Sequence, residues 1–442
     1  MTEDGITRRA LLLGGTALAI GGLPFGARGQ LRVDITRGQI EPLPIAVSPF
    51  AGDGAGAADL GRRLAELIAA DLDGSGLFRT IDRRAYIQTP AELRDLPRFA
   101  DWRQIDAQGL VTGVVRTSGA DGLTVEFRLW DVFAGTQMTG FRYTLSRSLW
   151  RRVGHKIADA VYERMTGEKG YFDTRIAYVS QTGPATDRIK RIAIMDQDGA
   201  NHRFLTRGRE LVLTPRFTPD TRSLAYLAYR GRTPGIYLRD LASGRDRRLG
   251  SFSGMNFSPR FSPDGRLMLM TIARDGNSDI FAFELAGRRL TRLTDHPAID
   301  TSPSFSPDGR RIVFNSDRGG SPQLYVMDRD GGAPRRISFG AGRYGSPVWS
   351  PRGDFIAFTK IKGGYFHIGV MRPDGSDERL ITRSFFDEAP VWSPNGRIIM
   401  FTRQDPATDR TRLMRIDLTG YNLQEIPTPT DASDGDWSAL IP

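Results

Sequence analysis

The sequence predicts an α/β N-terminal domain followed by an all-β six-bladed β-propeller closed by its N- and C-terminal strands. Three observations predict this fold: a motif that recurs about every 44 residues, a first part without the motif, and complementary ends of the repeat array. We expect an export signal over residues 1–29, the α/β domain over 30–170 and the propeller over 171–442.

The recurring motif is a serine or threonine that follows an aromatic residue. Its six copies are spaced by 44, 44, 44, 43 and 45 residues. A proline stands two residues before the aromatic in each copy but the last, where Gly435 replaces it. The hydroxyl residues are Thr218, Ser262, Ser306, Ser350, Ser393 and Ser438, and the aromatics are Phe217, Phe261, Phe305, Trp349, Trp392 and Trp437.

Each copy contains the same order of strand and turn signals. The strand that ends in Pro-x-Phe/Trp-Ser is followed by a Pro-Asp-Gly type of turn, as at 263–265. Three further strands follow, of which "RIVFNS" (311–316), "LYVMD" (324–328) and "PRRIS" (334–338) are examples. Four short strands in about 44 residues are typical of a propeller blade.

The two ends of the array complete one blade. "RIAYVS" (175–180) matches the second strand of the unit, and "GDWSAL" (435–440) matches the first. We therefore expect the C-terminal strand to pair beside 175–180, which leaves no open edge. The repeated aromatic rings should pack between blades, because each buries about 150–250 Å². The Asp-Gly segments predict turns rather than calcium loops, since they lack dense alternating acidic ligands.

Residues before the array have a different pattern. Apolar residues four apart predict two helices, and alternating apolar residues predict four strands. The segment "TGEKGYFDT" (166–174) joins this region to the propeller. The helices are expected over 57–72 and 147–166, and the strands over 44–50, 109–117, 123–132 and 137–144.

The N-terminus has the features of a bacterial export signal. Arg8 and Arg9 precede an apolar segment of about a dozen residues, and Ala27-Arg28-Gly29 offers small residues for cleavage before Gln30. The paired arginines resemble a twin-arginine signal, and an ordinary Sec signal is the alternative. Since no other segment has 18 consecutive apolar residues, we expect the mature exported protein to be soluble.

Composition excludes several other classes. The formal charge is +10, and the 61 basic residues comprise five lysines and 56 arginines spread along the whole chain. A nucleic-acid binder would cluster such charge on one face, so we expect no nucleic-acid partner. The chain has no cysteine, which excludes disulfides and thiolate metal sites.

No motif predicts catalysis. The histidines are His155, His202, His296 and His367, and none has metal-ligand spacing to another. Neither a Gly-x-Ser-x-Gly elbow nor a phosphate-binding Gly-Lys loop occurs. We therefore expect no enzymatic activity, no cofactor and no metal.

Several segments together resemble the TolB family, the periplasmic components of the Tol-Pal system. They are "LPIAVSPF", "TGEKGYFDTRIAYVSQ", "APVWSPNG" and the repeat that begins at Ser302. The resemblance implies a monomeric binding protein that associates peripherally with the envelope through two partners, the lipoprotein Pal and the inner-membrane protein TolA. It also implies a role in outer-membrane integrity and in constriction during cell division.

The resemblance implies two binding segments. The TolA segment would be Gln30, Leu31, Arg32, Val33, Asp34, Ile35, Thr36, Arg37 and Gly38, for which an ordinary edge strand is the alternative. Pal would contact the loops that join one blade to the next, for which solvated connecting turns are the alternative. The Pal residues would be Met255, Asn256, Ser258, Asp300, Thr301, Tyr344, Asp387, Glu388 and Asp434.

A second hypothesis is an exported propeller hydrolase or carbohydrate-binding protein. Such a protein should carry a polar, titratable cluster in the propeller channel. A Pal receptor, in contrast, should hydrolyse no ester, peptide or glycoside.

Overall fold

The computed structural model describes residues 41–184, 186–230, 233–250, 252, 255–274 and 276–442. The expected export signal (1–29) and the expected TolA segment (30–38) lie outside these residues. No helix within the described ranges is long and apolar enough to cross a membrane.

The first part is an α/β domain with strand order β3-β1-β4-β5-β6 and β2 paired with β4. Both expected helices are present, although a 3-10 turn precedes the second. The strands are β1 (Leu43–Val47), β2 (Ala51–Asp53), β3 (Phe78–Thr80), β4 (Gly109–Ser118), β5 (Gly122–Asp131) and β6 (Thr136–Ser146). The helices are α1 (Ala57–Gly74), α2 (Phe99–Arg103) and α3 (Trp150–Thr166), with 3-10 turns η1 (Arg83–Ala85), η2 (Glu92–Arg94) and η3 (Arg147–Leu149).

Helices α1 and α3 pack closely because a glycine lies between them. A Cβ on Gly154 of α3 would stand 2.6 Å from Cδ2 of Leu67 on α1. Of the apolar residues that predicted the helices, Leu64, Ile68 and Ile157 are among those buried, whereas Leu149 is 43% exposed because it lies in the 3-10 turn before α3. The helical periodicity of the sequence therefore identified the packed faces.

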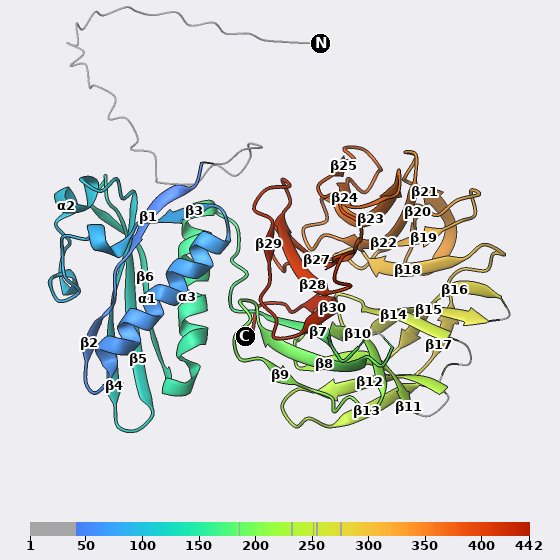
Figure 1. Cartoon of the computed structure of the whole chain (residues 1–442), viewed down its shortest axis with the longest axis horizontal. Helices are drawn as coiled ribbons and strands as arrows, with labels where there is room; N and C mark the ends of the chain where they lie inside the picture. Colours follow the sequence, from blue (N-terminus) through green and yellow to red (C-terminus); the bar gives the residue numbers. More distant parts are fainter. Residues whose placement is uncertain (1–40, 185, 231–232, 251, 253–254, 275) are drawn as a thin grey trace, which may run out of the picture. The chain divides into compact units, whose positions relative to one another are not determined.

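Within the described residues, the strands after Thr174 form six four-stranded antiparallel sheets, so the predicted six-bladed propeller is confirmed (Figure 1). Five blades are continuous in sequence. They are β10 (Leu211–Phe217), β11 (Ser223–Arg230), β12 (Thr233–Asp240) and β13 (Asp246–Gly250); β14 (Met255–Phe261), β15 (Leu267–Arg274), β16 (Asn277–Glu284) and β17 (Leu290–Arg292); β18 (Asp300–Phe305), β19 (Arg311–Ser316), β20 (Gln323–Asp328) and β21 (Gly331–Arg336); β22 (Arg343–Trp349), β23 (Ile356–Lys362), β24 (Tyr365–Met371) and β25 (Arg379–Leu380); β26 (Asp387–Trp392), β27 (Ile398–Gln404), β28 (Thr411–Asp417) and β29 (Gln424–Glu425).

The sixth blade is built from both ends of the array, as predicted. Its order is β30 (Asp431–Trp437), β7 (Arg175–Thr182), β8 (Ile189–Asp196) and β9 (Arg203–Phe204). Strand β30 is antiparallel to β7, with Trp437 opposite Ile176, and it lies beside β7 in Figure 1. The closing strand runs over 431–437 and not over the expected 435–440, because it begins before a bulge that the repeat pattern did not reveal.

Five of the six repeated aromatic residues are buried and Phe261 is partly buried, in agreement with the expected packing between blades. Trp349 of β22 is 4% exposed and packs with Val313 and Leu324 of the preceding blade. Trp392 of β26 packs in the same way with Ala357 of the blade before it. The period of 44 residues thus places one large ring at each blade contact.

In the five continuous blades the serine or threonine that follows the aromatic residue closes a turn. In one copy the Ser306 hydroxyl donates to Asp308 Oδ1 over 2.5 Å and accepts the Arg311 amide at 2.9 Å. Gly309, at a φ of 68°, supplies the left-handed residue that this turn needs. The aspartate thus serves the turn, in agreement with the expected turn chemistry.

We predict that Trp437→Ala lowers the free energy of unfolding by about 3–5 kcal/mol, because it empties a buried site on the closing strand. It also removes the hydrogen bond from indole Nε1 to Thr174 Oγ1 (2.8 Å). Urea unfolding followed by circular dichroism measures the change. The matched control is Tyr421→Ala, since Tyr421 is 57% exposed and should matter little; equal losses in the two variants would contradict the importance of the closing strand.

Candidate binding site at the channel mouth

Each first strand of a blade (β10, β14, β18, β22, β26 and β30) contains a β-bulge. The pairing register with the second strand shifts at the same place in every blade, for example between Thr301 and Ser304. The skipped positions hold the proline of the repeat, or Gly435 in the last copy. Since proline cannot donate to a ladder, the bulge is the place in a strand that tolerates it.

In four described blades the residue before the proline of the repeat lies in the left-handed region, and so does Asp434 before Gly435 in the sixth blade; this turns their side chains toward the channel. Five such residues are Thr214 (φ 48°), Ser302 (54°), Ser346 (46°), Ala389 (54°) and Asp434 (51°). All five line one cavity of about 150 Å³, together with Arg216, Arg260 and Glu388. We call this cavity and its lining the channel mouth.

The expected Pal residues lie in first strands and not in loops, which corrects their predicted placement. The strands begin several residues before the Pro-x-aromatic motif because pairing with the second strand continues across the bulge. Met255, Asn256 and Ser258 belong to β14, where the backbone of Asn256 pairs with that of Ile272. The others belong to later blades: Asp300 and Thr301 to β18, Tyr344 to β22, Asp387 and Glu388 to β26, and Asp434 to β30.

Three of the expected residues are buried and make hydrogen bonds within the protein: Asp300, Asp387 and Tyr344. Asp300 is 0% exposed and accepts two hydrogen bonds from Arg318, at 3.0 and 2.8 Å. Asp387 is also 0% exposed and pairs with Arg403 at 2.7 and 2.8 Å. Since buried, paired carboxylates hold neighbouring strands, their first role is structural.

Tyr344 occupies the equivalent position in its blade and is 2% exposed. Its hydroxyl donates to Glu378 Oε2 at 2.8 Å and accepts from Lys360 Nζ at 2.5 Å. The amine of Lys360 also contacts Glu378 Oε1 at 2.5 Å. This position, five residues before the aromatic, therefore supports the first strand from within in each of these blades.

Among the expected residues whose side chains the structure describes, Glu388, Asp434 and Thr301 are partly exposed, and the first two line the channel mouth. Burial, together with the negative charge of Asp434, raises the pKa of Glu388 to about 7. The side chain of Thr301 donates to Asn315 Oδ1 at 3.3 Å. These residues offer hydrogen-bonding groups and a carboxyl that changes charge near neutral pH.

A second group of charges lies deeper in the channel, and the sequence analysis missed it. Asp436 Oδ2 accepts the Phe217 amide at 2.8 Å, and its Oδ1 lies 3.5 Å from Arg260 Nη1 and 3.9 Å from Arg216 Nε. Burial, reinforced by repulsion from Arg216, lowers the pKa of Arg260 to about 9. The available signal was an arginine between the proline and the phenylalanine in two copies of the motif.

This group bears on the second hypothesis. A polar, titratable cluster is what a propeller hydrolase or carbohydrate-binding protein should have in its channel, and the cluster is present. Its presence therefore does not separate the two hypotheses.

Arg216 and Arg260 also line a second cavity of about 250 Å³ at the other end of the channel. Neither cavity has a histidine among its described lining residues.

Apolar side chains are exposed at or shortly before the start of four first strands. They are Leu211 (44% exposed), Ile299 (46%), Phe339 (72%) and Phe385 (55%). Exposed apolar residues beside charged groups are typical of surfaces that bind other proteins.

The α/β domain contacts the opposite end of the propeller, where the turns after the first and third strands lie. Arg352 Nη1 pairs with Glu168 Oε1 at 2.6 Å, and Asn395 Nδ2 donates to the Lys169 carbonyl at 2.9 Å. Asn422 Nδ2 likewise donates to the Gly74 carbonyl at 3.0 Å. In the part of the chain that the structure describes, the α/β domain therefore leaves the channel mouth uncovered.

A closed six-bladed propeller with an uncovered polar mouth, preceded by an α/β domain, defines a class of propeller proteins with two domains. A family model described as the TolB beta propeller domain matches residues 162–441, and one described as the TolB amino-terminal domain matches residues 31–138. The chain belongs to the TolB family.

Individual relatives agree with this assignment. Proteins named "Tol-Pal system protein TolB" from Paramagnetospirillum magneticum and Pelagibacter ubique are 55% identical over 232 residues and 53% identical over 245 residues. These matches cover 52% and 53% of this chain, and they span about half of each relative, 52% and 55%. The crystal structure of TolB from Acinetobacter baumannii superposes with a TM-score of 0.82 at 30% identity, over 93% of this chain and all of that one. The expectation that this chain is not an enzyme accords with the family.

We predict that the stability of the protein depends on pH through Glu388. The raised pKa means that the folded protein keeps a proton between pH 4.5 and about 7 that the unfolded chain releases. This contribution is present in full below pH 4.5 and is lost as the pH rises to about 7. Urea midpoints measured from pH 4.5 to 8 should therefore fall more steeply in the wild type than in Glu388→Gln; parallel curves would contradict the assigned pKa.

Proposed function

We propose that the protein is a periplasmic component of a Tol-Pal system that binds the lipoprotein Pal at the channel mouth and TolA through residues 30–38. Through these partners it supports outer-membrane integrity and constriction during cell division. The observation that carries the first half of this proposal is the channel mouth, which is lined by two partly exposed carboxyl groups on first strands, while exposed apolar side chains stand at or shortly before the start of four such strands.

The mouth suits a protein partner because its groups stand on rigid strands. Glu388 and Asp434 lie at bulges of paired strands, so their positions are fixed before binding. Phe339 and Phe385 add exposed aromatic surface, which is the kind of side chain that often anchors protein interfaces. Preorganised groups of this kind lose little conformational entropy when a partner binds.

The buried residues of the expected set have a supporting role in this proposal. Asp387 and its partner Arg403 fix the start of β26, next to Glu388. Asp300 and Arg318 do the same for β18, next to Thr301. Contact with Pal would then fall on Thr301, Glu388 and Asp434, with the buried neighbours holding the backbone in place.

The proposed TolA segment is supported by its sequence pattern. Leu31, Val33 and Ile35 alternate with polar residues, as in a strand that pairs with the edge of another sheet. The segment lies outside the described residues, so its support comes from this pattern and from the match to the TolB amino-terminal domain, which begins at residue 31.

We predict that the two partners depend on different parts of the chain. The double variant Glu388→Ala, Asp434→Ala should weaken binding of the soluble domain of Pal at least tenfold, because it removes both carboxyl groups of the mouth, and should leave TolA binding unchanged. Deletion of residues 30–38 should abolish TolA binding and preserve Pal binding. Isothermal titration with each purified partner measures both effects.

The matched control is Asp330→Asn, which removes a carboxylate that is 92% exposed on a turn at the opposite end of the propeller. It should change neither affinity. Loss of both partners in either test variant would contradict separate sites. Unchanged Pal binding in the double variant, or hydrolysis of an ester, peptide or glycoside by the wild type, would contradict the proposed role of the mouth.

A further inference from the structure

A buried histidine lies where helix α3 meets the propeller. His155 is 2% exposed, and its Nδ1 is 2.6 Å from Oδ2 of Asp71 on α1. The other oxygen of Asp71 accepts a hydrogen bond from Gln197 Nε2 at 2.8 Å. Asp71 therefore fixes the ring orientation and directs the second nitrogen, Nε2, away from the α/β domain.

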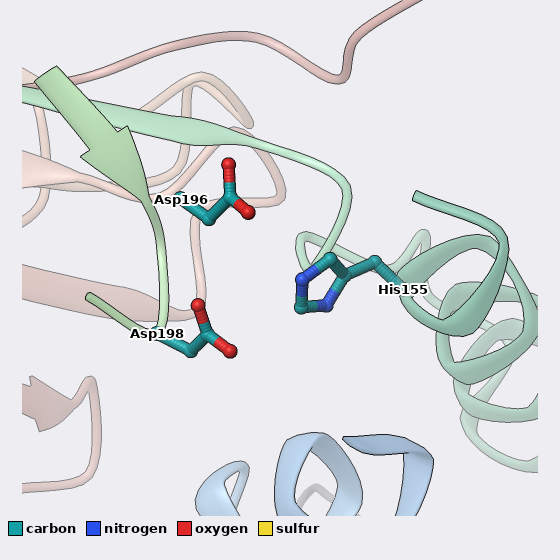
Figure 2. A group of neighbouring side chains, drawn as sticks. All are labelled: His155, Asp196 and Asp198. Carbon is teal, nitrogen blue, oxygen red and sulfur yellow. The ribbon is translucent and has the colours of Figure 1, made fainter. Parts of the chain in front are cut away.

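The second nitrogen points at two carboxylates of the propeller. Nε2 of His155 is buried and has no hydrogen-bond partner among the described residues. Figure 2 shows this side of the ring directed toward Asp196, the last residue of β8, and Asp198 in the turn that follows. Ligand atoms of the three residues lie within 4.8 Å of one another.

We propose that His155, Asp196 and Asp198 form a binding site for a divalent first-row transition metal of the zinc class. One imidazole nitrogen and two carboxylates form a donor set that suits Zn²⁺, which binds both ligand types at about 2.0–2.2 Å. A carboxylate bound to the remaining nitrogen of a ligand histidine is the usual outer partner in zinc sites. Asp71 occupies that position.

The local charges fit a divalent cation. Asp71, Asp196 and Asp198 supply three negative charges, and Arg151 supplies one positive charge through contacts with Asp196 and Asp198. With a neutral imidazole, the group has a net charge of about −2, which one divalent ion neutralises. A carboxylate has two oxygens and can contact an arginine and a metal at the same time.

The aspartates have room to close around an ion. Tetrahedral donors about 2.1 Å from a zinc ion are about 3.4 Å apart, so the present spacing must shorten by rotation of the side chains. The side chains of Asp196 and Asp198 are 16% and 26% exposed, so an ion can enter from solvent. Their rotation must rearrange the hydrogen bonds from Asn201 Nδ2 to Asp196 (2.6 Å) and from the Ala200 amide to Asp198 (3.2 Å). A metal here would link α3 of the α/β domain to the sixth blade.

A proton is the competing occupant of Nε2. Burial alone would lower the pKa of His155, but the charge of Asp71 outweighs burial and raises it to about 9. A metal must displace this proton in order to bind. The sequence analysis expects no metal because histidine spacing alone does not bring residue 155 beside 196 and 198; the structure supplies that proximity.

The test is isothermal titration of the purified, EDTA-treated protein with Zn²⁺. We expect one equivalent to bind, with affinity at least tenfold weaker in His155→Gln and in Asp198→Asn. The second variant is isosteric at a partly exposed position, so it keeps the test interpretable if His155→Gln unfolds. The matched control, His296→Gln, removes an exposed imidazole elsewhere and should bind zinc as the wild type does.

Two further readouts report on the same site. Zn²⁺ should raise the melting temperature of the wild type and of His296→Gln but not of Asp198→Asn, since a ligand of the folded state stabilises it. Co²⁺ should give the visible absorption of a low-coordinate ion in the wild type but not in Asp198→Asn or His155→Gln. Equal zinc affinity in the wild type and both site variants, or no zinc binding to the wild type, would overturn the proposal and leave the proton as the occupant.

Discussion

The pairing of β30 with β7 is the constraint on which the rest of the propeller depends. It joins residues about 260 positions apart, with Trp437 opposite Ile176 and the Ser438 hydroxyl accepting the Arg175 amide at 2.9 Å. Because this pairing closes the ring, every first strand faces a common channel, and every repeated aromatic residue has a neighbouring blade to pack against. Without closure, β7 would expose an unpaired edge, and the last continuous blade would expose an apolar face.

The bulge in each first strand connects the fold to the site. Proline at the bulge removes a ladder donor, and the residue before it takes a left-handed conformation that directs its side chain into the channel. The same local feature therefore bends the strand and lines the mouth. Where the residue before proline is Ser302 or Ser346 the mouth gains a hydroxyl, and where Asp434 precedes Gly435 it gains a carboxylate.

The repeat made most of the fold predictable. Six aromatic residues at nearly constant spacing fixed the number of blades, and the complementary ends at 175–180 and 435–440 identified the closing blade. The bulge was not predictable from alternation, because an extra residue reverses which side chains face inward. The family resemblance placed Asp387 and Glu388 together as contact residues in a loop. Both lie in β26, where Asp387 is buried against Arg403 and Glu388 lines the mouth. Arg260 with Asp436, and His155 with Asp198, depend on long-range proximity that one sequence does not contain.

Amide hydrogen exchange of the native protein tests the closing pair most directly. If β30 and β7 close the ring, their amides at 431–437 and 175–182 should be protected as strongly as those of the continuous blade β18–β21 and should exchange together with them. Early exchange of β30 and β7, while β18–β21 stays protected, would contradict the account, because it would mean that the ring opens without loss of the blades.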